Sequence, residues 1–286
     1  MAFNKGFIRQ ISSSNYTKSK LSTNSRLKVV ENIAKQFNDV SLEKFPITRL
    51  DNLIKYKKIQ NAHNNCVIEQ LDVNPNNYPS ISTILSQTMS PESLRILKRW
   101  EAEKIRQLGF EGFLEYKKEL FSRGKILHQN IQTYLETRDI KQLNFNSKSQ
   151  ENFWKSIEHV MPNIKELYGS ELSIYHPYLK YRGILDCVAT YNDIPAIFEW
   201  KTSEKLKPTI AHTYDNPLQT VAYYSCLQYD QPANLKIPNI KEAILVIAYE
   251  DGSKADVHIL EPNYRITAWK QFLKRLEQYW SQLANK

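Results

Sequence analysis

The pattern of hydrophobic and polar positions predicts a protein in which helices come first and strands follow. Apolar residues recur with the helical period in a stretch that opens at Ser90, and again after Gly124. A third helical pattern covers residues 151–168. From Glu171 the pattern changes to short apolar runs typical of strands: ELSIYHPYL, YRGILDCVATY and AIFEWKT. We therefore expect an α/β fold, with a mixed central sheet behind an N-terminal helical cap.

Local signals place the ends of several elements. Ser90 can cap the first helix, Pro91 suits its first turn, and Gly109 predicts its end. A helix is expected over DNPLQTVAYYSCLQ, and AILVIAY has the continuous apolar character of a buried central strand. The dipeptide at 251–252, Asp-Gly, predicts a turn into the partner strand ADVHILE. An apolar stripe over residues 269–283 predicts a closing helix.

The charge is distributed unevenly along the chain. The 286 residues include 41% hydrophobic and 24% charged residues, as in an ordinary globular protein. No stretch approaches the roughly 20 apolar residues of a membrane span. The formal net charge is +9, but residues 1–30 hold six basic residues and no acidic one, which leaves +3 for the remainder. Net charge is therefore weak evidence for a DNA-binding surface.

The charge and turn signals also divide the chain. Residues 1–30 are basic and rich in Ser and Thr, which is typical of a mitochondrial transit peptide; the alternative is a disordered basic arm that contacts nucleic acid. Residues 31–78 are expected to form a loosely structured lead-in, and residues 79–286 one domain with a cap over 79–140 and a core over 141–286. The three cysteines are too widely spaced for a disulfide framework, and they suit a reducing compartment such as the matrix.

The first predicted helix presents two distinct faces. An apolar face runs along it at Leu94, Leu97, Ile105 and Leu108. A basic cluster lies on another face, at Arg95, Arg99 and Arg106. This cluster is either a solvated face or a stripe that contacts phosphates.

Two predicted strands joined by a turn each carry an acid, Asp186 and Glu199. If the turn centres on residues 192–193, the two acids face each other, with Cβ atoms about 4.5–5.5 Å apart. Lys201 lies two residues after Glu199 and so shares its face. Two carboxylates this close repel unless a cation lies between them, and Mg²⁺ or Mn²⁺ prefers oxygen ligands. The pattern predicts a metal site with an adjacent amine; the alternative is a structural ion pair of Glu199 with a lysine.

The same residues resemble the signature of the PD-(D/E)xK nucleases, as Asp186 followed by Glu199-x-Lys201. GKILH, which ends at His128, resembles the upstream histidine motif of the RecB-type exonuclease branch. QTVAY, from Gln219 to Tyr223, is similar to the Q-x-x-x-Y motif of that branch, and these two residues share a helix face. GILDCVA, WKTSEK, DNPLQTVAY and AYEDGS are similar to the mitochondrial genome maintenance exonucleases, over roughly residues 79–283.

The resemblance implies a restriction-endonuclease-like core and a role for each matching residue. The implied metal ligands are His128, Asp186, Glu199 and the backbone carbonyl of Trp200, with Lys201 as the catalytic lysine. Gln219, Tyr223, Ser203 and Lys205 would bind substrate or steady the site, and Glu171 would be an outer-shell acid. Without the family, a lone histidine at the edge of a helix is more often a core side chain.

The resemblance also implies an activity. It indicates a metal-dependent exonuclease that hydrolyses single-stranded DNA as a monomer in the mitochondrial matrix, trimming ends or flaps during mitochondrial DNA maintenance. One alternative is a structure-selective endonuclease with the same core. The other is a non-catalytic nucleic-acid-binding module, which an intact set of Asp186, Glu199 and Lys201 argues against.

Overall fold

The structure is a computed structural model, and it describes residues 23–37, 41–49, 74–232 and 235–285. Most of the predicted transit peptide, residues 1–22, lies outside the described residues. The first described helix is α1 (Thr23–Phe37), which crosses the boundary placed at residue 30 and enters the predicted lead-in. None of the helices in the described ranges combines the length and the apolar composition that crossing a membrane requires.

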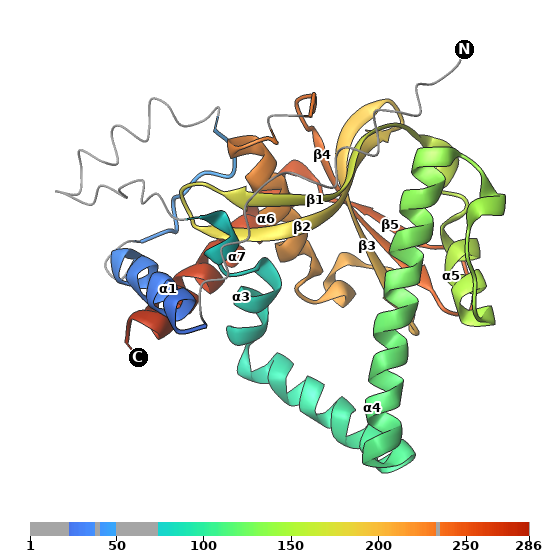
Figure 1. Cartoon of the computed structure of the whole chain (residues 1–286), viewed down its shortest axis with the longest axis horizontal. Helices are drawn as coiled ribbons and strands as arrows, with labels where there is room; N and C mark the ends of the chain where they lie inside the picture. Colours follow the sequence, from blue (N-terminus) through green and yellow to red (C-terminus); the bar gives the residue numbers. More distant parts are fainter. Residues whose placement is uncertain (1–22, 38–40, 50–73, 233–234, 286) are drawn as a thin grey trace.

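The centre of the fold is a five-stranded sheet in the order β1-β2-β3-β4-β5 (Figure 1). The strands are β1 (Ile164–His176), β2 (Tyr181–Tyr191), β3 (Ile194–Ser203), β4 (Glu242–Tyr249) and β5 (Asp256–Ile259). The first three form an antiparallel meander, β4 runs parallel to β3, and β5 returns antiparallel to β4. The parallel step is bridged by α6 (Asn216–Tyr229), which is the helix expected over DNPLQTVAYYSCLQ. The mixed sheet confirms the predicted α/β class and is consistent with a restriction-endonuclease-like core.

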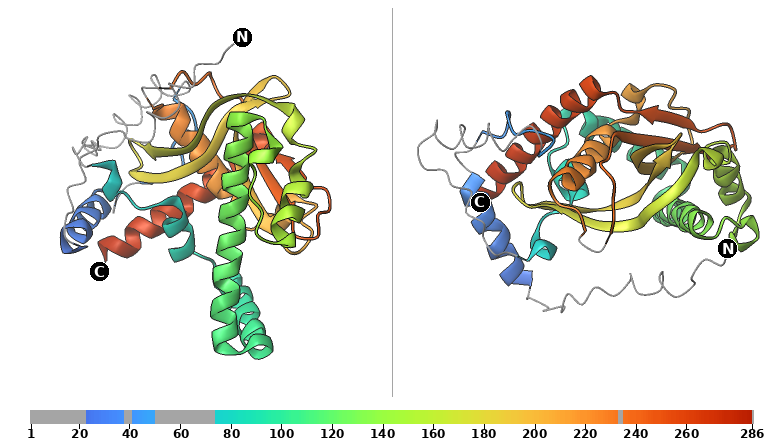
Figure 2. Two further views of the ribbon diagram at one scale, coloured as in Figure 1. Left: turned by 45° about the vertical axis from the view of Figure 1, so that its right-hand side comes forward. Right: turned by 90° about the horizontal axis from the view of Figure 1, so that it is seen from above.

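Helices cover both faces of this sheet (Figure 2). On one face, residues of α1, α3 (Ile81–Gln87), α6 and α7 (Pro262–Ala284) form a large apolar cluster with β1 and β2. On the other face, α5 (Lys148–Ile157) and the end of α4 pack on β3 and β4. Alternation along β3 serves both layers: Ile197 enters the first cluster, whereas Phe198 and Trp200 enter the second. The predicted central strand and closing helix are both confirmed.

The element α4 (Pro91–Thr137) consists of two helical legs joined at Gly109, whose backbone is non-helical at φ 72° and ψ 170°. Residues 91–108 form the first leg and residues 110–137 the second, and together they make a helical arm that projects from the sheet (Figure 1). The predicted end of the first helix at Gly109 is therefore confirmed. The predicted start at Gly124 is wrong, because Gly124 lies inside the second leg. A glycine within a helix is tolerated at a cost of about 1 kcal/mol.

The helix predicted over residues 151–168 is also corrected. It is α5, which ends at Ile157, and the chain enters β1 at Ile164 after a short 3-10 turn that contains Pro162. Proline removes a backbone donor and so favours such a break. The apolar residues beyond it belong to a strand, because four or five positions are too few to separate a helical from an extended pattern.

Candidate active site

The register of the β2–β3 hairpin is as predicted. Residues 192 and 193 both have positive φ, at 48° and 67°, as a two-residue hairpin turn requires. Backbone pairing then runs from Tyr191 with Ile194 to Cys187 with Phe198. Asp186 and Glu199 come one step beyond the last pair, at the point where β3 continues beside β4 and β2 continues beside β1.

Asp186 bridges the two strands at this split in the sheet. Its Oδ2 accepts a hydrogen bond of 2.7 Å from the backbone N–H of Trp200. The Asp186 side chain thus accepts the hydrogen bond that a backbone carbonyl of β2 accepts in the paired part of the β2–β3 ladder. The bond fixes the carboxylate of Asp186 against β3, and the other oxygen, Oδ1, is left to face α4.

Glu199 and Lys201 form a close pair beside Asp186. Lys201 Nζ donates to Glu199 Oε1 at 2.5 Å, and the Glu199 residue is only 1% exposed. Burial raises the pKa of the Glu199 carboxyl to about 7, and the Asp186 charge adds to this, while Lys201 acts in the opposite direction. Burial opposes the charged form of Lys201, but Glu199 and Asp186 hold the pKa of its ammonium above the usual value.

The second oxygen of Glu199, Oε2, is buried and has no hydrogen-bond partner among the described residues. A buried carboxylate oxygen without a partner is costly in free energy. Such an atom calls for a ligand from outside the chain. A cation is the best partner, because the negative charge of the Asp186 carboxylate lies close to that of Glu199 and a cation would offset both.

The second leg of the arm brings His128 to the same place. Its Nε2–H donates to the carbonyl oxygen of Trp200 at 3.1 Å, which turns Nδ1 towards the acids. Nδ1 lies 3.3 Å from Asp186 Oδ1 and 3.8 Å from Glu171 Oε1. Burial alone would lower the pKa of His128, but hydrogen bonds to Asp186 and Glu171 raise it to about 10. Fixing one ring nitrogen on a backbone carbonyl is how proteins orient a histidine that binds a metal.

Glu171 is drawn into the cluster by an unusual backbone. Its neighbours on β1 pair with Cys187 and Leu185 of β2, which places Glu171 opposite Asp186. The φ of Glu171 is 49°, a left-handed value that is uncommon for a residue with a side chain inside a strand. Strain of this kind collects at functional sites. The resemblance gave Glu171 only an outer-shell role, and the signal that sequence reasoning lacked was the β1–β2 register.

The geometry fits a divalent cation. Within the described part of the chain, His128, Glu171 and Asp186 present ligand atoms that all lie within 4.8 Å of one another. They line a cavity of about 10 Å³, roughly the volume that one water-sized sphere occupies. Carboxylate oxygens are common ligands of divalent cations, and an imidazole nitrogen can add a further ligand. Glu199 stands next to this group, turned to Lys201, and the Trp200 carbonyl keeps a second lone pair beyond its bond to His128.

The two residues of the predicted Q-x-x-x-Y motif contact each other on α6. Gln219 Nε2 donates to the Tyr223 hydroxyl at 3.0 Å. Tyr223 is 5% exposed, and burial, with the charge of Glu199 nearby, raises its pKa. Its ring packs directly on Gly183 of β2, where a Cβ atom would lie 2.3 Å from a ring carbon. The motif therefore lies above the sheet next to the acids, in the position that helix periodicity predicts.

The other predicted substrate-binding residues lie outside this cluster. Ser203 Oγ donates to the Lys205 carbonyl at 2.6 Å and accepts from the Lys205 N–H at 3.2 Å, so its hydroxyl closes a local turn. Arg95, Arg99 and Arg106 are exposed on the first leg of the arm, and Arg106 pairs with Glu103 of the same leg. None of these contacts involves the acids of the sheet.

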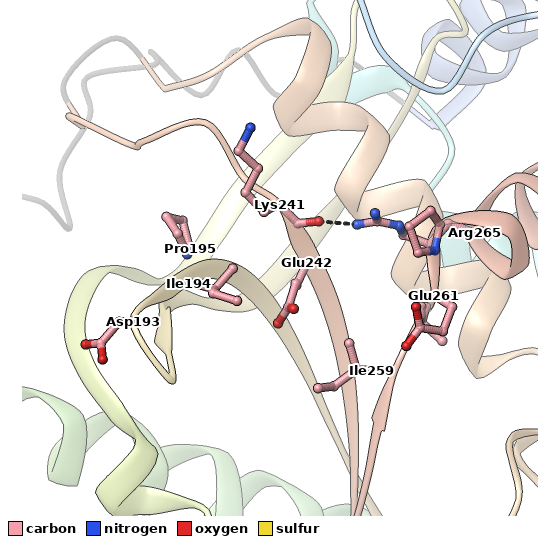
Figure 3. Close-up of a pocket in the computed structure, with 10 residues that line it drawn as sticks. Asp193, Ile194, Pro195, Lys241, Glu242, Ile259, Glu261 and Arg265 are labelled. Atoms are coloured by element: carbon pink, nitrogen blue, oxygen red, sulfur yellow. Dashed lines mark hydrogen bonds between the residues drawn. The ribbon is translucent and has the colours of Figure 1, made fainter.

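A second hollow, of about 440 Å³, lies at the opposite end of β3 (Figure 3). Its walls include Ile194 at the start of β3, Glu242 at the start of β4 and Arg265 of α7. It is larger than the cavity at the acids but contains none of the predicted site residues. The candidate site is therefore the split between β2 and β3.

Comparison with known proteins identifies relatives. No family model matches the chain. Three curated proteins named mitochondrial genome maintenance exonuclease 1 are similar to it: that of Mus musculus (37% identical over 71% of this chain and 59% of the relative), that of Homo sapiens (32% over 79% and 65%) and that of Xenopus tropicalis (36% over 70% and 57%). The predicted resemblance to the mitochondrial genome maintenance exonucleases is confirmed. The chain spans about three fifths of the length of these relatives.

Proposed function

We propose that this chain is a metal-dependent exonuclease that hydrolyses phosphodiester bonds in single-stranded DNA. The observation that carries the proposal is the meeting of His128, Glu171 and Asp186 beside the Glu199–Lys201 pair. The names of the three relatives support an exonuclease role in mitochondria. We extend this to the matrix, to the trimming of DNA ends or flaps during mitochondrial DNA maintenance, and to a monomer in which the helices of residues 79–140 cap the core.

The residues that would hold the ion are His128, Glu171, Asp186, Glu199 and the carbonyl of Trp200. When bound, Mg²⁺ supplies neutralisation of phosphate charge and polarisation of the phosphorus–oxygen bond. The chain contributes the fixed geometry. The Trp200 N–H holds Asp186, and the Trp200 carbonyl holds the ring of His128, so the backbone of one residue orients two of the ligands.

Lys201 would act on the reacting phosphate. Its ammonium is held at the edge of the site by Glu199, and the Lys201 side chain is 28% exposed, so it is accessible from the solvent side. There it would orient the attacking water and stabilise the negative charge that builds up on phosphate oxygens as water attacks phosphorus and the leaving oxygen departs. Gln219 and Tyr223 would keep β2 and its Asp186 in place, because they contact each other and the Tyr223 ring packs on Gly183 of β2.

Labelled oligonucleotides test the proposal. Single- and double-stranded forms, with each end free or blocked, are incubated with Mg²⁺ or with EDTA. We expect digestion of single strands that have a free end, in Mg²⁺ and not in EDTA. Cutting of circular or doubly blocked substrates would favour the endonuclease, and binding without digestion in Mg²⁺ would favour the non-catalytic module.

A further inference from the structure

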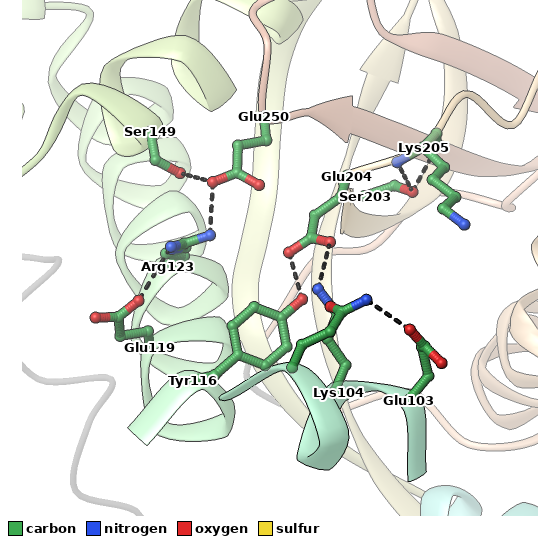
Figure 4. A network of polar contacts seen from close by, with 11 residues as sticks. Glu103, Lys104, Tyr116, Glu119, Arg123, Ser149, Ser203, Glu204, Lys205 and Glu250 are labelled. Carbon is green, nitrogen blue, oxygen red and sulfur yellow. Dashed lines mark hydrogen bonds and ion pairs between the residues drawn. The ribbon is translucent and has the colours of Figure 1, made fainter. Parts of the chain in front are cut away.

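Both legs of the helical arm reach one carboxylate, that of Glu204, the first residue after β3 (Figure 4). Tyr116 of the second leg donates its hydroxyl to Glu204 Oε1 at 2.5 Å. Lys104 of the first leg places Nζ 3.9 Å from Glu204 Oε2. The same ammonium lies 4.3 Å from the centre of the Tyr116 ring. An ammonium and a phenolic hydroxyl therefore converge on a single anion at the end of β3.

The arm does not need Glu204 to keep its position on the core. Arg123 of the second leg pairs with Glu250 at 2.6 Å, and Glu250 also accepts from Ser149 Oγ at 2.9 Å (Figure 4). The first leg is held to the second by ring contacts of Trp100 with Phe113 and Tyr116, with centroids 6.0 and 6.3 Å apart. The contact with Glu204 is an addition to these attachments.

The contact is also weak as an ion pair. A separation of 3.9 Å is at the outer limit for a salt bridge, and the side chains of Lys104 and Glu204 are 24% and 35% exposed. Pairs of this kind contribute little to stability, because water screens them. Leaving Lys104 therefore costs Glu204 little, and the Tyr116 hydroxyl that Glu204 also gives up can donate to a phosphate oxygen in its place.

Lysine and hydroxyl donors are the groups that proteins use to hold the phosphates of nucleic acids. Glu204 follows Lys201 by three residues, and at the rise of an extended chain this separates them by roughly 10 Å. The donors thus lie within a few nucleotides of the amine that would act on the scissile phosphate. Lys104 from the first leg and Tyr116 from the second would together hold a DNA strand where it passes the arm.

We propose that Lys104 and Tyr116 form a phosphate-binding subsite for the single strand, and that Glu204 occupies this subsite until a backbone phosphate displaces it. The proposal rests on the proposed function, because it takes DNA as the substrate. It makes Glu204 a competitor of the substrate. Removing the charge of Glu204 must then strengthen DNA binding, whereas removing the charge of Lys104 must weaken it.

The test is the affinity of a labelled single-stranded oligodeoxythymidylate, measured by fluorescence anisotropy in EDTA over a range of salt concentrations. For Glu204→Gln, which keeps an acceptor for Tyr116, we expect the Kd to fall about 3- to 10-fold. For Lys104→Gln we expect a similar rise in Kd and a salt slope smaller by about one phosphate contact. Tyr116→Phe should raise the Kd less, because it removes a hydrogen bond and no charge.

Glu115→Gln is the matched control. Glu115 is an exposed acid next to Tyr116 in the sequence, and this change alters the net charge of the protein by the same amount as Glu204→Gln. If Glu115→Gln strengthens binding as much as Glu204→Gln, the effect is general attraction and the subsite is wrong. If Glu204→Gln and Lys104→Gln shift the Kd in the same direction, their pair is only a structural latch, and the proposal also fails.

Digestion by the wild-type protein in Mg²⁺, measured alongside, distinguishes a failure of the subsite from a failure of the proposed function. A wild type that digests the oligonucleotide while the variants lack opposite shifts overturns the subsite alone. A wild type that neither binds nor digests it overturns the proposed function and the subsite together. Thermal unfolding of each variant establishes that a change in Kd reflects binding by folded protein.

Discussion

The split between β2 and β3 and the helical arm both gather charged residues, but they hold them differently. At the split the Trp200 N–H holds Asp186, and Lys201 holds Glu199, which is only 1% exposed. On the arm most charged side chains are exposed, and several of them pair with neighbours on the two legs, as Lys117 does with Glu101 at 3.6 Å. Electrostatic interactions are strong where water is excluded and weak where it is present. This contrast agrees with the proposal of chemistry at the split and of DNA binding on the arm.

The apolar residues follow the same division. Along the second leg, Leu127 and Ile131 are buried against the sheet. Along the first leg, Leu94 and Leu97 are 40% and 38% exposed, and Phe110, just after the joint, is 61% exposed. The helical period identifies an apolar stripe in both legs, but it does not say which stripe has another element against it. Substitutions should accordingly change turnover at the split and affinity on the arm.

Asp186→Asn should have the largest effect, because it removes a charge from the centre of the ligand cluster. We expect both the affinity for Mn²⁺ and the turnover of single-stranded DNA to collapse, turnover by at least about 10²–10³-fold. Calorimetry of Mn²⁺ binding and an oligonucleotide assay measure the two. Asp193→Asn is the control, since Asp193 lies in the turn of the same hairpin and pairs with Lys165 at 2.8 Å, away from the site. Equal behaviour of the two variants would contradict the assignment.

Lys201→Ala should lower turnover by about 10²–10³-fold and leave Mn²⁺ and DNA binding close to wild type, because its contribution is realised in the transition state. The same two measurements apply. Lys270→Ala removes an exposed lysine of α7 that has no predicted role at the site, and it should change turnover far less. If the Lys201 variant digests DNA at a rate near that of wild type, the site at the split is wrong.

Gly183→Ala should destabilise the protein by about 1–3 kcal/mol, because its Cβ would lie 2.3 Å from the buried Tyr223 ring. A displaced Tyr223 should also reduce turnover. Gly124→Ala is the opposite case: it lies in the second leg of the arm, its Cβ would be 4.0 Å from Thr202 Oγ1, and better helix propensity should stabilise it by up to about 1 kcal/mol. Denaturant unfolding measures both. If both variants lose a similar amount of unfolding free energy, the close contact between Gly183 and Tyr223 does not explain the destabilisation.

The smallest effect is expected on the first leg. Changing Arg95, Arg99 and Arg106 together to Gln should raise the Kd for single-stranded DNA a few-fold and flatten its salt dependence, because fewer counterions are released. Turnover at saturating DNA should stay near wild type. The control replaces three exposed lysines elsewhere with Gln, namely Lys148, Lys270 and Lys274. If the three arginine changes leave the salt slope unaltered, this face of the first leg is solvated and does not contact phosphates.

Local rules were enough for the register of the hairpin. The chemistry of a two-residue turn predicted the pairing that is observed from Tyr191–Ile194 to Cys187–Phe198, and the period of two along a strand predicted the contact of Lys201 with Glu199. The i, i+4 relation likewise paired Gln219 with Tyr223. These predictions succeed because each depends on residues close together in the chain, whose relative positions the backbone geometry decides.

The tertiary structure decided the rest. Glu171 joined the acids only through a left-handed backbone and the register between β1 and β2. Tyr116 contacts Glu204, which is 88 residues away in the sequence, on the arm whose two legs are joined at Gly109. No local period encodes such contacts, because they arise when distant elements pack together and bury their apolar faces. The sequence by itself determined which residues could perform the chemistry, and the packing of the arm and the sheet determined which of them meet.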